Sequence, residues 1–161
     1  MSPDTAVAVA IRPALTLLPS RMDSPEAVAL LLAIGGQESR FEHREQIRGP
    51  ARGFYQFESA GIAGVLRHHA SAQLSSEVCE TLHYPATVEA VHAAVRDNDV
   101  LATVFARLLL WTHPAALPGR ADADGAWAYY LALWRPGKPH AKTWPTYHAL
   151  AWRQIDNLKE T

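Results

Sequence analysis

Apolar residues, mostly alanine and leucine, recur at three- and four-residue spacing along nearly the whole chain, and this period constrains the fold more than any other feature. It is the period of one face of an α-helix, whereas the alternation typical of a half-buried strand is scarce. The sequence therefore predicts a mainly α-helical protein. The expected helices cover about residues 4–18, 23–38, 58–70, 75–82, 87–96, a segment starting at Asn98 or Asp99, one running from Asp122 or Asp124 to Trp134, and 144–158.

Several polar residues mark where these helices begin. Asp23 and Glu26 have the spacing of a capping box, and Thr87 is a plausible N-cap. The helix after Asn98 has a strongly apolar face that predicts a place in the core, formed by Leu101, Val104, Phe105, Leu108 and Leu109.

The chain has 161 residues, of which 48% are hydrophobic and 19% are charged. This length and composition predict one compact domain over residues 1–161, and no repeat or long linker divides it. Within that domain, residues 23–57 and 122–135 carry the features from which a function can be inferred.

Charge and composition argue against several function classes. Fifteen basic and sixteen acidic residues give a formal charge of −1, so we expect no nucleic-acid partner. The single cysteine, Cys79, excludes an internal disulfide, and the eight histidines show no metal-ligand spacing. No glycine-rich phosphate loop is present. We therefore expect no metal or cofactor. We also expect the protein to be a monomer.

No segment has the length of a membrane span. The longest apolar stretch, Ala27 to Gly36, is about half of the ~20 residues that cross a bilayer. The first residues include Asp4 and lack the positive start of a secretory signal. We therefore expect no membrane insertion, no signal peptide and synthesis in the cytoplasm.

Glu38 ends the apolar face of the second expected helix. It follows three residues of that face at spacings of four, three and four: Ala27, Leu31 and Ile34. Burial raises the pKa of a carboxyl group, and a raised pKa suits a general acid near neutral pH. In the alternative interpretation, Glu38 reaches water at the helix end or pairs with Arg40 or Arg44.

Residues 41–57 differ from the rest of the chain. The segment is polar, contains Gly49-Pro50 and Gly53, and ends in the alternating run Phe54-Tyr55-Gln56-Phe57. This composition predicts an irregular loop or a short β-hairpin.

Three short motifs resemble those of the soluble lytic transglycosylases and goose-type lysozymes. They are the pair Glu38-Ser39, the run Ala51-Arg52-Gly53-Phe54-Tyr55-Gln56 and the later run Ala128-Tyr129-Tyr130-Leu131-Ala132. The chain departs from the family pattern at Tyr55, where methionine is usual, at Tyr130, where asparagine is expected, and in lacking the glycine of the third motif.

This resemblance implies a lysozyme-like helical domain with a small β-hairpin beside a cleft. It also implies cleavage of the β-1,4 bond between N-acetylmuramic acid and N-acetylglucosamine in peptidoglycan glycan strands. Glu38 would protonate the leaving oxygen and then act as base for attack by the sugar's own 6-hydroxyl, so that no second carboxylate is needed.

The resemblance further assigns the substrate-binding residues. Ser39 would orient Glu38 or contact substrate, and Gly53 would let the backbone approach a sugar. Gln56 would bond a sugar hydroxyl or N-acetyl group, and Tyr55 would contribute to the same surface. Tyr129 would face Glu38 across the cleft, from the wall formed by residues 122–135.

Two alternatives stay open. Glu45 could be a second carboxylate that activates water, as in the plant-type chitinases and their phage endolysin relatives. Alternatively, the fold could serve as a non-catalytic glycan-binding or virion protein. The compact form resembles phage-encoded enzymes that reach the cell wall through a holin or as part of the virion.

Overall fold

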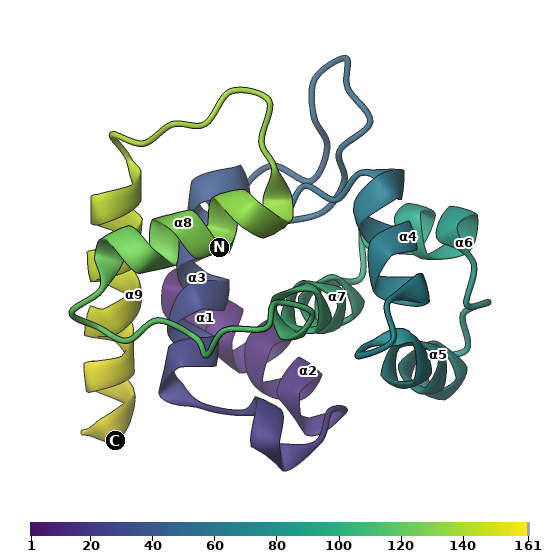
Figure 1. Cartoon of the computed structure of the whole chain (residues 1–161), viewed down its shortest axis with the longest axis horizontal. Coiled ribbons are helices and arrows are strands. Elements are labelled where there is room, and N and C mark those ends of the chain that lie inside the picture. The colour runs from purple at the N-terminus through teal and green to yellow at the C-terminus, as the bar shows by residue number, and fades with distance from the viewer. Residues whose placement is uncertain (161) are drawn as a thin grey trace.

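The computed structural model describes residues 1–160 as helices joined by loops (Figure 1). In chain order the elements are α1 (Pro3–Ala6), the π-helix η1 (Val7–Ile11), α2 (Arg12–Thr16), the 3-10 helix η2 (Ser20–Met22), α3 (Pro25–Ser39), α4 (Ser59–Arg67), α5 (Ala72–Thr81), α6 (Val88–Ala94), α7 (Asp99–Trp111), α8 (Ala123–Trp134) and α9 (Trp144–Lys159). The mainly α-helical class is confirmed.

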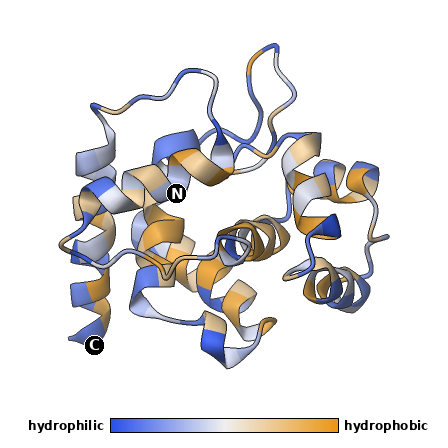
Figure 2. Cartoon of the chain, viewed as in Figure 1, coloured by the Kyte–Doolittle hydropathy of each residue, from blue (hydrophilic) through white to orange (hydrophobic). Residues whose placement is uncertain are grey.

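Two groups of helices meet at α7. Helix α3 packs along α9, and α8 contacts α9 on the same side of the molecule. Helices α4, α5 and α6 form the second group. Helix α7 lies between them and contacts η1, α2 and α3 on one side and α4 and α5 on the other. It is mostly apolar (Figure 2), as a helix packed on several sides requires.

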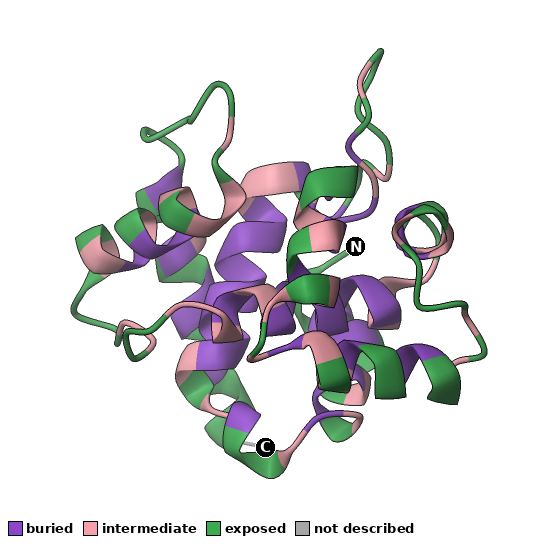
Figure 3. Ribbon diagram, turned by 45° about the vertical axis from the view of Figure 1, so that its right-hand side comes forward, coloured by how far each residue is buried: buried purple, intermediate pink, exposed green. Residues whose placement is uncertain are grey.

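Helix α3 is buried on all sides rather than along one face. Every residue from 27 to 36 is buried, and the helix runs through the buried centre of its group (Figure 3). Two glycines permit this packing, because a Cβ at Gly35 would lie 2.2 Å from the Phe41 ring and one at Gly36 would lie 2.5 Å from the Tyr147 ring. Because the two glycines have no side chain, the rings of Phe41 and of Tyr147 in α9 can approach the backbone of α3 closely.

The expected helix starts are largely confirmed. The side chains of Thr87, Asn98 and Asp122 accept hydrogen bonds from backbone N–H groups three residues later, as N-caps do. At the start of α3 the expectation was wrong by one residue. Ser24, and not Asp23, accepts the bond from the N–H of Ala27.

The first expected helix, residues 4–18, is divided in the structure. A turn of π-helix separates α1 from α2, and the helical run ends at Thr16. Pro13, the second residue after the π-turn, has no N–H to donate to the carbonyl four residues earlier.

The expected β-hairpin is not present, which corrects that part of the fold prediction. Residues 41–57 contain two isolated bridges, Glu45 with Arg52 and Arg52 with Phe57, and no strand. Positive φ angles at Phe41, Arg48, Gly53 and Gln56 interrupt the extended backbone that a strand needs. The aromatic run is instead a tight turn in which Phe54, Tyr55 and Phe57 are all buried.

Within residues 1–160, no helix combines the length and apolar character that a membrane span requires.

Candidate functional site

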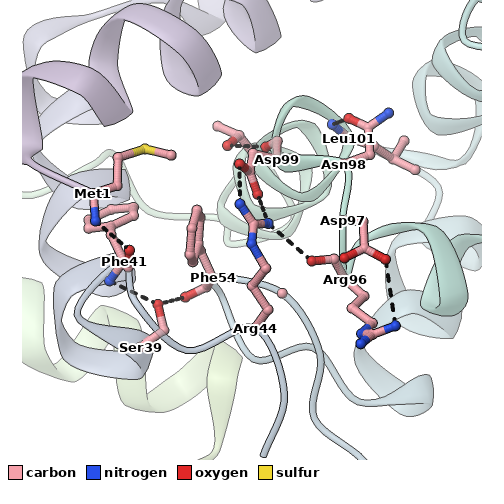
Figure 4. A network of polar contacts seen from close by, with 12 residues as sticks. Met1, Ser39, Phe41, Arg44, Phe54, Arg96, Asp97, Asn98, Asp99 and Leu101 are labelled. Atoms are coloured by element: carbon pink, nitrogen blue, oxygen red, sulfur yellow. Dashed lines mark hydrogen bonds and ion pairs between the residues drawn. The ribbon is translucent and has the colours of Figure 1, made fainter.

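Three consecutive residues at the end of α3 contact three different parts of the fold. Gln37 accepts a hydrogen bond from Thr143 and donates one to the carbonyl of His140, in the loop before α9. Glu38 accepts a hydrogen bond from Tyr130 of α8. Ser39 donates to the carbonyl of Phe54, in the loop after α3 (Figure 4). The last turn of a buried helix thus joins α8 and two loops around one carboxyl group.

The carboxyl group of Glu38 is partly buried, and the Tyr130 hydroxyl donates to its Oε1. Burial raises the pKa of Glu38 from 4.5 to about 7, and the bond from Tyr130 lowers it by a smaller amount. The interpretation of Glu38 as a solvated residue paired with a neighbouring arginine is therefore not what the structure shows. Its carboxyl group is a proton donor or acceptor near neutral pH.

Tyr130 is held by tryptophan rings. Its ring stacks on Trp144, with centroids 5.3 Å apart and planes 11° apart, and it lies against Trp127 and Trp134 at 5.3 and 6.1 Å. Burial and the neighbouring Glu38 raise the pKa of the Tyr130 hydroxyl. The phenol therefore stays protonated at neutral pH and can donate to the carboxylate.

Tyr129 does not occupy the place predicted for it. Its hydroxyl donates to the carbonyls of Leu110 and Ala115, each at 3.1 Å, and its ring stacks on His113. Adjacent residues of a helix point about 100° apart, so only one of the two tyrosines can face Glu38. The structure assigns that position to Tyr130.

Sequence reasoning left the choice between Tyr129 and Tyr130 open and favoured Tyr129, although the chain carries a signal for Tyr130. Trp127, Tyr130 and Trp134 follow one another at spacings of three and four, so they share a helix face. The motif resemblance favoured Tyr129 instead, because it weighed position in a motif rather than the face of the helix.

Ser39 is buried and serves the backbone around it. Its hydroxyl lies 3.1 Å from the carbonyl of Gly35 and 2.7 Å from that of Phe54, and it accepts a bond from the N–H of Phe41 at 3.1 Å. These contacts fix the loop to the helix end beside Glu38. All the partners of the Ser39 hydroxyl are thus backbone groups.

The loop of residues 40–57 is also anchored to α7. Both terminal nitrogens of Arg44 donate to Asp99, at 2.5 and 2.9 Å, and the guanidinium lies over the Phe54 ring at 4.3 Å (Figure 4). His92, which sequence reasoning did not single out, donates from Nε2 to the carbonyls of Pro50 and Phe57. These contacts join residues that are 42 or more positions apart for Arg44 with Asp99 and His92 with Pro50, so no local motif predicts them.

The remaining residues assigned to substrate have structural partners. Tyr55 is buried, and burial raises the pKa of its hydroxyl, which lies 3.4 Å from that of Thr103. Gly53 has a φ of +74°, and a Cβ there would lie 2.2 Å from the carbonyl oxygen of Val95. Gln56 donates from its side chain to the carbonyl of Gly53 at 2.8 Å. The close approach that the structure shows at Gly53 is to the backbone of Val95.

Glu45 lies on the exposed part of the same loop. Its carboxylate pairs with Nε of Arg96 at 2.8 Å, and both side chains are about half exposed, 53% and 48%. A surface pair of this kind is weak. Glu45 therefore shares neither the burial nor the hydroxyl partner of Glu38.

The loops before α4 and before α9 leave the same end of the molecule, where α3 ends, in both views of the chain (Figures 1 and 3). Together, residues 40–57 and 135–143 hold seven Lys and Arg residues and two acidic residues, although the chain as a whole has a formal charge of −1. Basic residues that are scattered in the sequence are thus brought to the end of the molecule that holds Glu38.

Two pockets lie away from Glu38. One is lined by residues of 94–100 with Val9 and Tyr84, and the other by residues of 107–117 with Tyr129. Among residues 1–160, no group of three or more His, Cys, Asp or Glu side chains is arranged to hold a metal ion.

Comparison of the chain with protein-family models, with curated proteins and with solved structures finds no match. The motifs and the geometry around Glu38 are therefore what a functional proposal must rest on.

Proposed function

We propose that this protein is a peptidoglycan-cleaving glycosidase in which Glu38 is the single catalytic acid and base. In this proposal it cleaves the β-1,4 bond between N-acetylmuramic acid and N-acetylglucosamine. Glu38 protonates the leaving oxygen and then, as carboxylate, assists attack of the muramyl 6-hydroxyl on the anomeric carbon. The product ends in an anhydro sugar, and no water is consumed.

The observation that carries the proposal is the carboxyl group of Glu38, whose pKa of about 7 populates both the acid and the base near neutral pH. A glycosidase that uses one carboxyl group for both steps needs such a value. The Tyr130 hydroxyl stabilises the carboxylate that forms when the proton leaves.

The state of Glu45 favours one carboxylate over two. A hydrolase that inverts configuration needs a second carboxylate free to activate water, about 6.5–9.5 Å from the first. Glu45 is exposed and ion-paired with Arg96 instead. The two-carboxylate hydrolase is accordingly the second candidate.

The charge of the two loops fits the substrate. Peptidoglycan strands carry carboxylate groups on their stem peptides, and the loops around the end of α3 have a surplus of five basic residues. Electrostatic attraction of this kind speeds association and falls with ionic strength.

A wall-lysis assay tests the proposal. Insoluble peptidoglycan is incubated with the protein, with Glu38→Gln and with Glu80→Gln, the same change at an exposed position of α5. We expect Glu38→Gln to lower the release of soluble sugars by about 100-fold or more, and Glu80→Gln to leave it unchanged. Equal release by the two variants would exclude Glu38 as the acid, and binding to the wall without release by any form would indicate a non-catalytic glycan-binding protein.

A further inference from the structure

Arg107 is a buried cation whose hydrogen-bonding capacity is not used up by the protein. It lies on α7 and is 2% exposed. Its Nε donates to the carbonyl of Met22 at 2.8 Å, but its Nη1 is buried and has no hydrogen-bond partner among the residues that the structure describes. A buried donor without a partner is costly, and more so when it carries charge.

The charge of Arg107 is present at neutral pH and lacks a bonded counter-ion. Burial lowers the pKa of its guanidinium to about 10, so it stays protonated. Tyr129 and Asp23 act on it electrostatically, but the carboxylate of Asp23 forms an ion pair with Arg12 at 3.1 Å. Trp111 faces the guanidinium at 5.2 Å and offers its ring but no anion.

A pocket of about 270 Å³ adjoins this cation. Its wall is formed by Arg107, by the segment that follows it and by Tyr129 of α8. Most of the lining is apolar, contributed by Leu110, Trp111, Pro114, Ala115, Ala116 and Leu117. The pocket is at the small end of the size range of ligand sites and combines apolar walls with few polar groups, as such sites do.

The polar groups that line the pocket indicate which charge a ligand there would carry. The Tyr129 hydroxyl already donates to two carbonyls. His113 accepts a bond at Nδ1 from the N–H of Ala115, which leaves Nε2 as the ring nitrogen that can donate. The single charge of one guanidinium can neutralise a monoanion, whereas a phosphate dianion calls for more donors and more positive charge.

We propose that this pocket binds a small carboxylate with an apolar body, its carboxylate at the guanidinium of Arg107 and its hydrocarbon part against the apolar lining. The site is built from α7, the segment after it and α8, and it shares no residue with the contacts of Glu38. It is therefore independent of the proposed glycosidase activity.

Calorimetric titration at pH 7 and constant ionic strength tests this site, with hexanoate as the probe and hexanamide as its neutral counterpart. We expect saturable binding of one hexanoate per chain and binding of hexanamide weaker by about tenfold or more. Arg107→Met should weaken hexanoate binding by about tenfold or more. Arg21→Met is the matched control, because Arg21 also lies over the Trp111 ring, at 5.7 Å, but is exposed and does not line the pocket.

A second measurement uses the unaltered protein, so that the test does not depend on the folding of Arg107→Met. Hexanoate should shift the amide NMR signals of residues 110–117, and shifts confined to other segments would overturn the proposal. Failure of hexanoate to saturate, equal binding to Arg107→Met, or tighter binding of inorganic phosphate would do the same.

A further titration with acetyl-Ala-Leu, a dipeptide that ends in a free carboxylate, identifies the source of the ligand. Tighter binding of the dipeptide than of hexanoate would support the carboxylate site and assign it to a peptide end. Weaker binding would support it as a site for free carboxylates. Because Glu38→Gln leaves this pocket intact, loss of wall lysis and loss of hexanoate binding are separate outcomes.

Discussion

At the scale of single residues, the surroundings of Glu38 decide what its carboxyl group can do. Burial at the end of α3 raises its pKa to about 7, and the bond from Tyr130 limits that rise. At neutral pH about half of the molecules carry the acid and half the base. Two substitutions separate the contributions of burial and of Tyr130.

Glu38→Gln should make stability less dependent on pH. Because the pKa of Glu38 is higher in the folded chain than the ordinary 4.5, the folded state binds more protons than the unfolded state between these two values. The free energy of unfolding therefore falls as pH rises from 4.5 to 7 and changes no further above 7. We expect Glu38→Gln to match the parent protein at pH 4 and to exceed it by up to about 3 kcal/mol at pH 8.

Urea unfolding of both proteins at pH 4 and pH 8 measures this difference. If the gap between them were the same at the two pH values, Glu38 would not titrate with a raised pKa.

Tyr130→Phe should raise the pKa of Glu38 further. The change keeps the ring on Trp144 but removes the hydroxyl that stabilises the carboxylate. The alkaline limb of the pH–rate profile of wall lysis, where Glu38 loses its proton, should therefore move to higher pH. Tyr129→Phe is the control, because the hydroxyl of Tyr129 bonds to Leu110 and Ala115 and should not move that limb. A limb that stayed in place in Tyr130→Phe would remove Tyr130 from the mechanism.

How far single residues could be predicted depended on whether the signal was local. The position of Glu38 at the end of an apolar face offered burial as one of two interpretations, since a regular helix fixes which side chains share a face. The structure, in which Glu38 is partly buried, decides between them. The choice between Tyr129 and Tyr130 depended on how α8 is rotated against α3. That rotation is set by packing of Trp127, Trp134 and Trp144 across several helices.

At the scale of elements, the loop of residues 40–57 is held by side-chain contacts from three parts of the chain, and it brings polar and aromatic groups to the end of α3. Ser39 binds it at Phe54, Arg44 joins it to Asp99, and His92 bonds the carbonyls of Pro50 and Phe57. Gly53 allows the turn to lie directly on the backbone after α6, at Val95.

Gly53→Ala should destabilise the protein, because alanine is strained at a φ of +74° and its Cβ would collide with the carbonyl of Val95. We expect a loss of about 2 kcal/mol or more in the free energy of unfolding. Gly64→Ala is the matched control. Gly64 lies within α4 with nothing within 4 Å of the added Cβ, so the change should stabilise the protein by about 0.5–1 kcal/mol. Thermal or urea unfolding measures both changes. If Gly53→Ala left the free energy of unfolding unchanged, the turn would not lie against the backbone of Val95.

Elements were predictable where local residues specify them. Thr87, Asn98 and Asp122 marked helix starts, because an N-cap acts within one turn of its own backbone. The composition around Phe54 predicted an irregular loop or a short β-hairpin, and the structure has a tight turn. The burial of three aromatic side chains against α7, α8 and the end of α3 outweighed strand propensity, which depends strongly on context.

At the scale of the whole molecule, the buried helix α3 ends where two exposed loops with a surplus of basic residues emerge (Figure 1). Gln37 and Ser39 bond to these two loops, and Glu38 between them bonds to Tyr130 of α8. The carboxyl group of Glu38 is therefore held at the end of a buried helix, beside loops whose positive charge would attract the anionic polymer of the proposed function.

Mass spectrometry of the soluble products of purified peptidoglycan tests the proposed mechanism most directly. The protein should release muropeptides that end in 1,6-anhydro-muramic acid, about 18 Da lighter than the products of hydrolysis, because no water enters the reaction. Glu38→Gln should release none. Reducing-end products would contradict the single-carboxylate mechanism and direct attention to Glu45, and anhydro products from Glu38→Gln would contradict the assignment of Glu38 itself.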